Sequence, residues 1–275
     1  MASQTRALLF AIAFVKHVPV QPVSPVLSVV VPCYNESGNV LPLVEAIRAV
    51  LDPLNLPYEV LFADDASTDD SWEQLRSLGA RDARIRGLRF ERNFGQSAAL
   101  WAGIQAARGR FIATLDADLQ NDPRDLPAFL EAIKKYDCVC GSRVANRQKG
   151  DSWLRRASSR IANGVRNRLT HETVTDSGCC YRVFRRECAS NLKFFKGMHR
   201  FLPTLFKIEG YTVVEIPVSH HPRFAGQSHY GVWNRLFASV YDLLAVRWMQ
   251  NRMFRFEVGE RVNFPPEAAG GDGNS

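Results

Sequence analysis

Two carboxylates spaced one residue apart follow a short apolar segment, and they are the residues of this chain best suited to chemistry. The segment at 111–115 is followed by a polar turn, a pattern typical of a buried central strand. Asp116 and Asp118 stand at i and i+2, so on an extended backbone their side chains point the same way and can share one hard divalent cation. The same pattern also occurs as a pair of solvated loop acids, and the rest of the chain has to decide between these interpretations.

Strand-like and helix-like segments alternate along much of the chain. Apolar segments typical of strands lie at 27–31, 58–63, 85–90, 111–115, 138–142 and 211–218. Helical spacing of apolar residues predicts helices at 39–51, around Trp72 and Leu75, at 98–107 and at 126–135. This alternation predicts an α/β fold with a mostly parallel, doubly wound sheet.

Acidic residues follow three of the predicted strands, namely Glu36, Asp65 and the pair Asp116 and Asp118. Ligands of doubly wound sheets bind at the carboxyl ends of the strands, so we expect these acids to meet there and form a nucleotide-and-metal site. The chain has no Gly-x-Gly-x-x-Gly after its first strand and no Walker motif, which argues against a dinucleotide-binding fold and a P-loop. A bound phosphate would therefore need a metal and arginine to neutralise it.

The chain is basic, with a net charge of +7 and a pI near 9.3, which indicates an anionic partner. Nucleic acid, phospholipid and nucleotide would all fit. Eight basic residues and one acid fall within 143–168, which is either a solvated helix face or a surface for phosphate or anionic membrane. A mean hydropathy of -0.18, without a long uncharged apolar run, argues against a transmembrane helix. The cysteine spacings fit neither a zinc site nor a disulfide scaffold and favour a cytosolic setting.

Composition divides the chain into four parts. We predict an N-terminal extension at 1–26, one domain at 27–231, an amphipathic helix at 232–258 and a disordered tail at 259–275. The helix either packs on the domain or lies in a membrane interface with its arginines at the headgroups. Its apolar stripe consists of Trp233, Leu236, Phe237, Val240, Leu244 and Trp248.

An ordered set of short motifs extends from Leu27 to Tyr241. In chain order they read VVVPCYNE, FADDASTD, RNFGQSAAL, DADLQNDP, GSR, LRRASSRIAN, DSGCCYRVFRRE, HRFLP and HHPRFAGQSHY. This set resembles glycosyltransferase family 2, and more closely its dolichol-phosphate mannosyltransferase-like branch, which glycosylates polyprenyl phosphates. The resemblance implies a GT-A fold and an inverting transfer from a nucleotide sugar that depends on Mg²⁺ or Mn²⁺.

By position in these motifs, the resemblance also assigns site residues. It places the nucleotide-sugar donor on Pro32, Tyr34, Glu36, Ala63, Asp65, Asp116, Ala117, Asp118, Arg223 and His229. It places the metal on Asp116, Asp118 and Gln120, and the acceptor phosphate on Arg143, Arg155 and Ser159. His229 is a departure, because members of the family often carry lysine there and a neutral histidine contributes less charge to a diphosphate.

The predicted catalytic residues suit glycosyl transfer; they are Asp116, Asp118, Arg143 and Asp176. A cation on the two aspartates, together with Arg223 in the polar loop at 220–230, would stabilise the charge of a leaving diphosphate. The alternative for that loop is a plain linker without contact to the diphosphate. A phosphate monoester acceptor is already anionic and needs only cationic positioning, so we expect no dedicated base, with Asp176 as the alternative base.

The expected partners follow from the resemblance and the charge. The donor would be of the GDP-mannose or UDP-glucose type, carrying a hexose such as mannose or glucose, and the acceptor a dolichyl or undecaprenyl phosphate. We expect a cytoplasmic protein, peripheral on the cytosolic face of a membrane, that contacts an anionic membrane surface and a membrane-anchoring partner but no nucleic acid. Two alternatives are a family 2 enzyme with a hydroxyl acceptor on a cell-surface glycan, and a non-catalytic module that binds membrane or nucleic acid.

Overall fold

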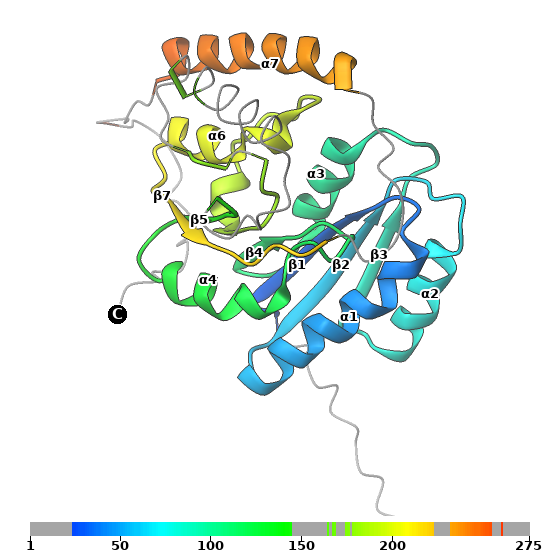
Figure 1. Ribbon diagram of the computed structural model, residues 1–275. Helices are drawn as coiled ribbons and strands as arrows, with labels where there is room; N and C mark the ends of the chain where they lie inside the picture. The colour runs from blue at the N-terminus through cyan, green and yellow to red at the C-terminus, as the bar shows by residue number, and fades with distance from the viewer. Residues whose placement is uncertain are drawn as a thin grey trace, which may run out of the picture.

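A mostly parallel sheet runs through the protein, and helices cover both of its faces (Figure 1). The computed structural model describes residues 24–144, 164, 167–168, 174–176, 178–222, 232–254 and 260, without the side chains of 232–240. Within this part of the chain the strands are β1 (Leu27–Cys33), β2 (Tyr58–Asp64), β3 (Ile85–Arg89), β4 (Phe111–Thr114), β5 (Cys138–Ser142), β6 (Arg182–Arg185) and β7 (Val213–Pro217). The helices are α1 (Ser37–Leu51), α2 (Ser71–Arg81), α3 (Gln96–Ala106), α4 (Leu126–Ala132), α6 (Leu202–Ile208) and α7 (Val232–Arg252).

The strand order β3-β2-β1-β4-β6-β5-β7 confirms the expected α/β class and the mostly parallel sheet. Strands β1, β2, β3 and β4 pair in parallel, and so do β5 and β7. Strand β6 is antiparallel to both β4 and β5 and separates them. The sequence patterns did not predict β6, because it has only four residues and begins and ends with arginine. Parallel neighbours with helical connections bring the carboxyl ends of β1, β2 and β4 to one edge.

Two apolar cores hold the layers together. The first lies between the sheet and α1, α2 and α4, and includes Val40, Ile47, Leu75 and Phe129. The second lies on the opposite face under α3, α6 and α7. Gly103 lets α3 lie directly on the sheet, because a Cβ there would collide with a methyl group of Val30. This close approach fixes the first turn of α3 beside the carboxyl ends of β2 and β4.

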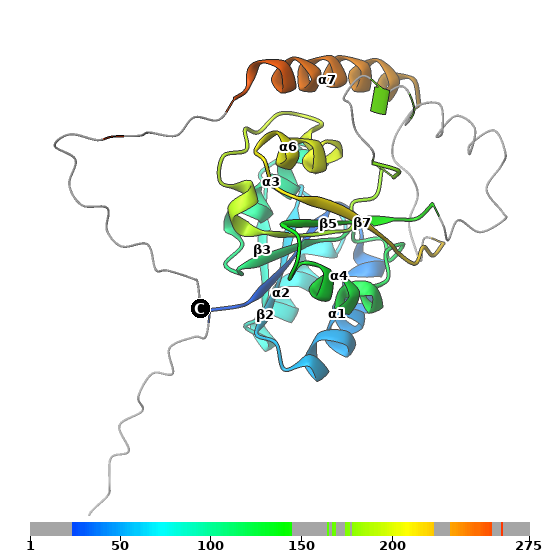
Figure 2. The ribbon, with the colours of Figure 1, turned by 90° about the vertical axis from the view of Figure 1, so that its left-hand side faces the viewer.

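Helix α7 is the outermost element on the α6 side of the molecule (Figures 1 and 2). It packs through Leu243 and Val246, which are 7% and 0% exposed. Leu244 and Trp248, members of the predicted apolar stripe, are instead 56% and 62% exposed. Of the two alternatives for this stripe, packing on the domain therefore does not hold for these two residues. Among the described helices, none is long and apolar enough to cross a membrane.

Candidate active site

The carboxyl ends of three strands bring most of the predicted acids to one edge of the sheet. In the register of β1 and β2, Pro32 pairs with Ala63, and the amide of Asp65 donates to the carbonyl of Cys33 at 2.9 Å. Strand β4 continues this edge, because the amide of Leu115 donates to the carbonyl of Val30 at 3.1 Å. The loops that carry Glu36, Asp65, Asp116 and Asp118 therefore leave the sheet side by side, as the sequence predicts.

The backbone of these loops is strained. Asn35, Ala66 and Leu119 have φ angles of 55°, 61° and 59°, and they follow β1, β2 and β4 respectively. Positive φ is uncommon for residues other than glycine, and for alanine and leucine it costs free energy that the surrounding packing has to offset. Such outliers concentrate at functional sites, so this shared feature supports one site built from all three loops.

The carboxylates Asp116 and Asp118 lie close enough to influence each other's ionisation. Burial raises the pKa of Asp116, and the negative charge of Asp118 raises it further. The side chain of Gln96 donates to Asp116 Oδ1 at 2.9 Å, and the amide of Gln120 donates to Asp118 Oδ1 at 3.2 Å. A bound cation would relieve the repulsion between these two partly buried negative charges.

The donor set fits a hard divalent cation. Among the described residues, no group of three or more His, Cys, Asp or Glu side chains could hold a metal ion. Two carboxylates are nevertheless enough for Mg²⁺, which usually binds through one or two protein carboxylates and completes its shell with substrate phosphates and water. Asp116, Asp118 and the amide oxygen of Gln120 would supply oxygen ligands of this kind.

Arg182 is a site residue that the sequence patterns did not predict. It is only 1% exposed and belongs to β6, next to Thr114 in register. Its positive charge acts to lower the pKa of Asp116, against the effect of burial. Its Nε and Nη1 atoms have no hydrogen-bond partner among the described residues. Arg182 therefore supplies a fixed charge behind the carboxylates, and its motif position gave no sign of this.

Asp65 holds the neighbouring loop in place. Its Oδ1 accepts a hydrogen bond from the amide of Phe94 at 2.7 Å, and its Oδ2 accepts one from the amide of Gly95 at 2.8 Å. Gly95 has a φ of 93°, which only glycine adopts without strain. The buried Asp65 thus fixes the entry to α3, and with it Gln96 beside Asp116. The role in donor binding that the resemblance implies for Asp65 stays a prediction.

Hydrogen bonds tie the loops after β1 and β2 together. The amide of Asn35 donates to Ser67 Oγ at 2.9 Å, and the amide of Thr68 donates to Asn35 Oδ1 at 2.7 Å. The amide of Glu36 donates to Ser71 Oγ at 2.9 Å, at the beginning of α2. These contacts hold the predicted donor-binding residues of both loops, including Tyr34 and Glu36, in one rigid unit.

Arg143 and Asp176 form a bidentate ion pair beside the sheet edge. Arg143 Nε donates to Asp176 Oδ2 at 2.7 Å, and Nη2 donates to Oδ1 at 2.9 Å. The Arg143 amide adds a third bond to Oδ2 at 3.1 Å. Burial acts to lower the pKa of the Arg143 guanidinium, but the hydrogen bonds to Asp176 and the negative charges nearby, chiefly that of Asp176, together raise that pKa. Both carboxylate oxygens of Asp176 thus accept hydrogen bonds from Arg143, and the pair fixes the orientation of the guanidinium.

His220 lies close enough to this ion pair and to the metal-binding loop to respond to their charges. Burial lowers its pKa, the charge of Arg143 lowers it further, and Asp118 and Asp176 act in the opposite direction. Its buried Nδ1 atom has no hydrogen-bond partner among the described residues. The sequence motif contains this histidine, but nothing local in it indicates that the ring feels the charges of Arg143, Asp118 and Asp176.

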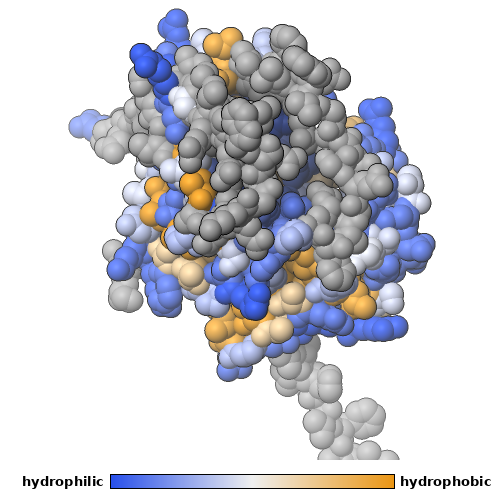
Figure 3. Space-filling view, viewed as in Figure 1, coloured by the Kyte–Doolittle hydropathy of each residue, from blue (hydrophilic) through white to orange (hydrophobic). Residues whose placement is uncertain are grey.

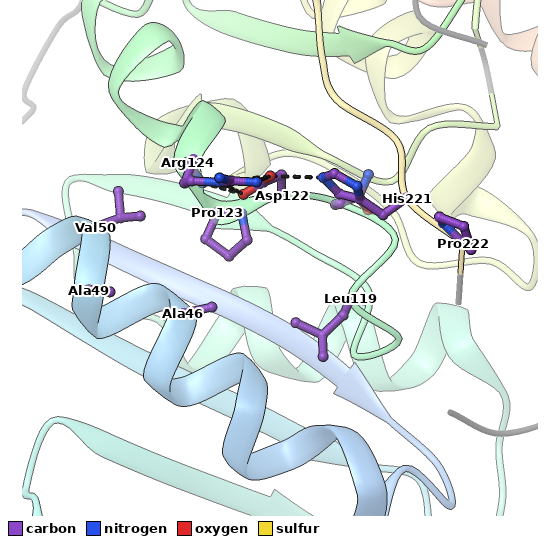
Figure 4. A pocket seen from close by; sticks show the side chains of 10 residues that line it. Ala46, Ala49, Val50, Leu119, Asp122, Pro123, Arg124, His221 and Pro222 are labelled. Carbon is purple, nitrogen blue, oxygen red and sulfur yellow. Dashed lines mark hydrogen bonds and ion pairs between the residues drawn. The ribbon is translucent and has the colours of Figure 1, made fainter. Parts of the chain in front are cut away.

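The segment that follows β7 is tied to the metal-binding loop. Asn121 and His220 form an isolated antiparallel bridge, and the amide of His221 donates to the carbonyl of Gln120 at 3.0 Å. His221 Nε2 also lies 2.9 Å from Asp122 Oδ2 (Figure 4). One residue further along the chain from Pro222 is Arg223, the predicted diphosphate contact, so these bonds anchor the chain directly before it.

A pocket of about 430 Å³ lies on the α1 side of this anchor (Figure 4). It is mostly apolar, and its lining includes Ala46, Ala49 and Leu119 beside Asp122 and His221. Small apolar patches between α1 and α4 are also visible on the face shown in Figure 3, where hydrophilic side chains predominate among the described residues.

The anchor gives a first prediction. Replacing Asp122 with alanine (Asp122→Ala) should lower kcat/KM for the donor by about tenfold to a hundredfold, because it removes the carboxylate that holds His221, and bonds to charged groups contribute about 1.5–3 kcal/mol. Steady-state kinetics at varied donor concentration would measure this. Arg124→Ala is the matched control, because Arg124 binds the same carboxylate but its side chain is 77% exposed. Equal losses in both variants would contradict a role for the contact with His221.

Four of the predicted site residues lie outside the described part of the chain. They are Arg155 and Ser159, assigned to the acceptor phosphate, and Arg223 and His229, assigned to the donor. Of the other predicted site residues, the structure brings together the donor residues of the first three loops, the metal residues, Arg143 and Asp176.

Solved structures with similar folds are GT-A glycosyltransferases. Mannosyl-3-phosphoglycerate synthase from Rubrobacter xylanophilus matches with a TM-score of 0.63 at 16% identity, over 88% of this chain and 79% of that one. Glucosyl-3-phosphoglycerate synthase from Mycobacterium tuberculosis, solved with Mn²⁺, UDP and glucosyl-3-phosphoglycerate, matches with a TM-score of 0.62 at 18% identity, over 82% and 80%. At these identities the likeness concerns the fold alone, and it confirms the expected GT-A architecture.

Curated relatives are more similar in sequence. The dodecaprenyl-phosphate galacturonate synthase of Rhizobium johnstonii is 38% identical over 225 residues, which are 80% of this chain and 66% of the relative. The undecaprenyl-phosphate 4-deoxy-4-formamido-L-arabinose transferase of Edwardsiella ictaluri is 36% identical over 219 residues, which are 79% and 66%. The chain thus spans slightly less than two thirds of the length of each relative. The profile of "Glycosyl transferase family 2" matches residues 28–192, and the chain belongs to this family.

Proposed function

We propose that this protein transfers a glycosyl group from a nucleotide-diphosphate sugar to the phosphate of a polyprenyl lipid, with Mg²⁺ or Mn²⁺ as cofactor. The observation that carries the proposal is the meeting of the pair Asp116 and Asp118 with Arg143 at one edge of a GT-A sheet. The curated relatives support the acceptor class, because their names describe products or substrates built on polyprenyl phosphate.

The nucleotide would lie over the loops that follow β1 and β2, which the hydrogen bonds of Asn35 and Ser67 hold together. Asp116, Asp118 and Gln120 would hold the cation next to the donor diphosphate. When bound, the cation would stabilise the negative charge that develops on the leaving diphosphate. Asp65 and Gln96 contribute indirectly. Asp65 fixes the loop that leads into α3, and Gln96, at the beginning of α3, donates a hydrogen bond to Asp116.

Arg143 would bind the acceptor phosphate. Its guanidinium is held in one orientation by Asp176, and a guanidinium matches phosphate oxygens in a bidentate manner. A phosphate monoester carries negative charge near neutral pH, so its oxygen can attack without first losing a proton to the protein. Positioning by Arg143 would therefore take the place of a general base.

The finer points of the proposal concern the sugar, the stereochemistry and the location. Attack from the face opposite the diphosphate inverts the anomeric carbon, and we propose this course. We propose a hexose such as mannose or glucose as the transferred sugar, although the sugars in the names of the relatives are galacturonate and 4-deoxy-4-formamido-L-arabinose. The reaction would take place at the cytosolic face of a membrane, where the protein is peripheral.

The decisive experiment supplies undecaprenyl phosphate, Mn²⁺ and one nucleotide sugar at a time. The donors should include GDP-mannose, UDP-glucose and a nucleotide-linked galacturonate, and the readouts are sugar in the lipid phase and free nucleotide. We expect transfer with one donor, its loss on addition of EDTA, and its recovery with excess Mn²⁺. NMR of the product would show whether the anomeric carbon is inverted. Nucleotide release with a saccharide acceptor but none with the lipid would instead indicate a hydroxyl acceptor.

A further inference from the structure

Large apolar and aromatic side chains are exposed on the second half of α7 and directly after it. The exposed fractions are 78% for Tyr241, 56% for Leu244, 62% for Trp248, 46% for Met253 and 82% for Phe254. Tyr241, Leu244 and Trp248 are spaced three and four residues apart, so they share one face of the helix. We call the exposed residues Tyr241, Leu244, Trp248, Arg252 and Phe254 the outer face of α7.

This outer face is not needed to close the core of the domain. The opposite side of α7 already packs through the buried residues Leu243 and Val246, with Met249 partly buried against the same core. Figures 1 and 2 both show α7 as the outermost layer on this side, with its long axis across α6. A helix of 21 residues is about 31 Å long, so it offers an extended rather than a point-like contact.

The charges around the outer face are basic. Arg252 is exposed on it, Arg247 flanks it, and the stretch from Leu243 to Phe254 contains no acidic residue. At Asp242, the neighbouring Lys196 and Arg200 act to lower the pKa of the carboxyl while its burial raises it, so basic residues also lie beside this end of the exposed half. Aromatic side chains next to arginines are typical of helices that lie in a lipid headgroup region.

A second copy of the chain is a poorer match for the outer face. Self-association would bring the arginines of two outer faces together, and the stretch from Leu243 to Phe254 has no carboxylate to pair with them. Asp242, directly before this stretch, already lies near Lys196 and Arg200 of its own copy. The net charge of +7 on each copy adds repulsion. The headgroups of an anionic bilayer would pair with the arginines while its hydrocarbon boundary accepts the apolar side chains.

We propose that the outer face of α7 lies in the surface of an anionic lipid bilayer, with the helix axis parallel to the membrane. The proposal rests on the proposed function, because it makes this face the membrane contact of an enzyme whose acceptor is a lipid. It would keep the enzyme at the surface that contains its acceptor.

Flotation of the full chain with vesicles, without donor or acceptor, tests this contact. Vesicles of phosphatidylcholine with about a third of phosphatidylglycerol should bind the protein more strongly than pure phosphatidylcholine, and added salt should weaken the binding. The double variant Leu244→Glu/Trp248→Glu should lower the vesicle partition coefficient at least tenfold, because it places two charges in the apolar part of the contact. Both positions are exposed, so the fold should not change.

The matched control is Leu41→Glu/Leu54→Glu, which adds the same charge at residues 45% and 44% exposed, in and directly after α1, the helix that covers the opposite face of the sheet. It should bind vesicles like the original protein. Equal binding by all three proteins, or equal losses in both variants, would overturn the proposal. A dimer that only the α7 variant dissociates, with vesicle binding unchanged, would assign the face to a second copy instead.

Turnover with a short-chain, water-soluble polyprenyl phosphate separates this inference from the proposed function. Without vesicles, both variants should retain the original rate, because neither changes the active site. If the original protein binds anionic vesicles through α7 but transfers no sugar to the soluble acceptor, the proposed function fails and the membrane contact stands. If transfer proceeds but the α7 variant binds vesicles like the original protein, only the inference about α7 fails.

Discussion

Replacing Asp118 with asparagine (Asp118→Asn) should lower kcat at least about a thousandfold, because an amide oxygen binds a divalent cation more weakly than a carboxylate does and supplies no negative charge to balance it. The loss of one electrostatic contact to a developing charge typically costs a hundredfold to a thousandfold, and here a cation would be lost or displaced with it. Mn²⁺ binding, measured by calorimetry without substrates, should weaken at least tenfold in the same variant. This second readout does not depend on catalysis.

The fold should survive this substitution. Asp116 and Asp118 repel each other, and the charge of Asp118 contributes to the raised pKa of Asp116. Removing one of the two charges therefore relieves this repulsion, and the Oδ1 of an asparagine can still accept the hydrogen bond from the amide of Gln120. Glu131→Gln is the matched control, because it makes the same chemical change on α4, where the side chain is 74% exposed. A variant Asp118→Asn that still binds Mn²⁺ and turns over normally would refute the assignment of the metal residues.

The acids of the site could be predicted because the information is local. Asp116 and Asp118 follow an apolar segment directly, and Glu36 and Asp65 follow two others, so strand periodicity was enough to place all four at the carboxyl edge of the sheet. The parallel pairing of β1, β2 and β4 then fixes how near they come. No long-range contact had to be known in advance.

Strand β6 and the residues it positions could not be predicted in this way. Its four residues insert antiparallel between β4 and β5, and that pairing depends on partners about 40 to 70 positions away in the chain. Arg182 is buried only because of this insertion, and a buried arginine contradicts the usual preference of charged residues for the surface. His220 and Asp122 were missed for the same reason, since the contacts that involve them join distant segments.

Helix α7 shows a different limit of prediction from sequence. Its periodicity predicts a helix, and the structure has one at Val232–Arg252. The sequence offers apolar residues on more than one side, however, and periodicity alone does not say which side meets the domain. Leu243 and Val246 are buried, whereas Leu244, one position after Leu243, and Trp248, two positions after Val246, are exposed.

The second large effect concerns Arg143. Replacing Arg143 with alanine (Arg143→Ala) should lower kcat/KM for the polyprenyl phosphate about a hundredfold or more, because it removes the bidentate cation that we assign to the acceptor phosphate. The KM for the donor should change much less. Transfer assays at varied acceptor concentration would measure both. An equal rise in the KM for the donor and the KM for the acceptor would argue that Arg143 supports the whole site instead.

Asp176 should matter only through Arg143. Asp176→Ala leaves the Arg143 guanidinium without its carboxylate, so kcat/KM for the acceptor should fall about tenfold. The free energy of unfolding should also decrease, by about 1–3 kcal/mol, less than for a fully buried pair because the Arg143 side chain is 20% exposed. In the double variant Arg143→Ala/Asp176→Ala, turnover should be no lower than in Arg143→Ala alone, because the residue that Asp176 orients is already missing.

A general base would behave differently in the same cycle. Removing a base lowers the rate by about a hundredfold to ten-thousandfold by itself, and its effect would multiply with that of Arg143→Ala. It would also remove the acidic limb of the pH dependence of kcat/KM, which Asp176→Asn should leave in place if Asp176 only orients Arg143. Both oxygens of Asp176 accept hydrogen bonds from Arg143 in the structure, and a proton on this carboxylate would remove the charge that holds the guanidinium. The acceptor phosphate, which carries its own charge, makes such a proton transfer unnecessary.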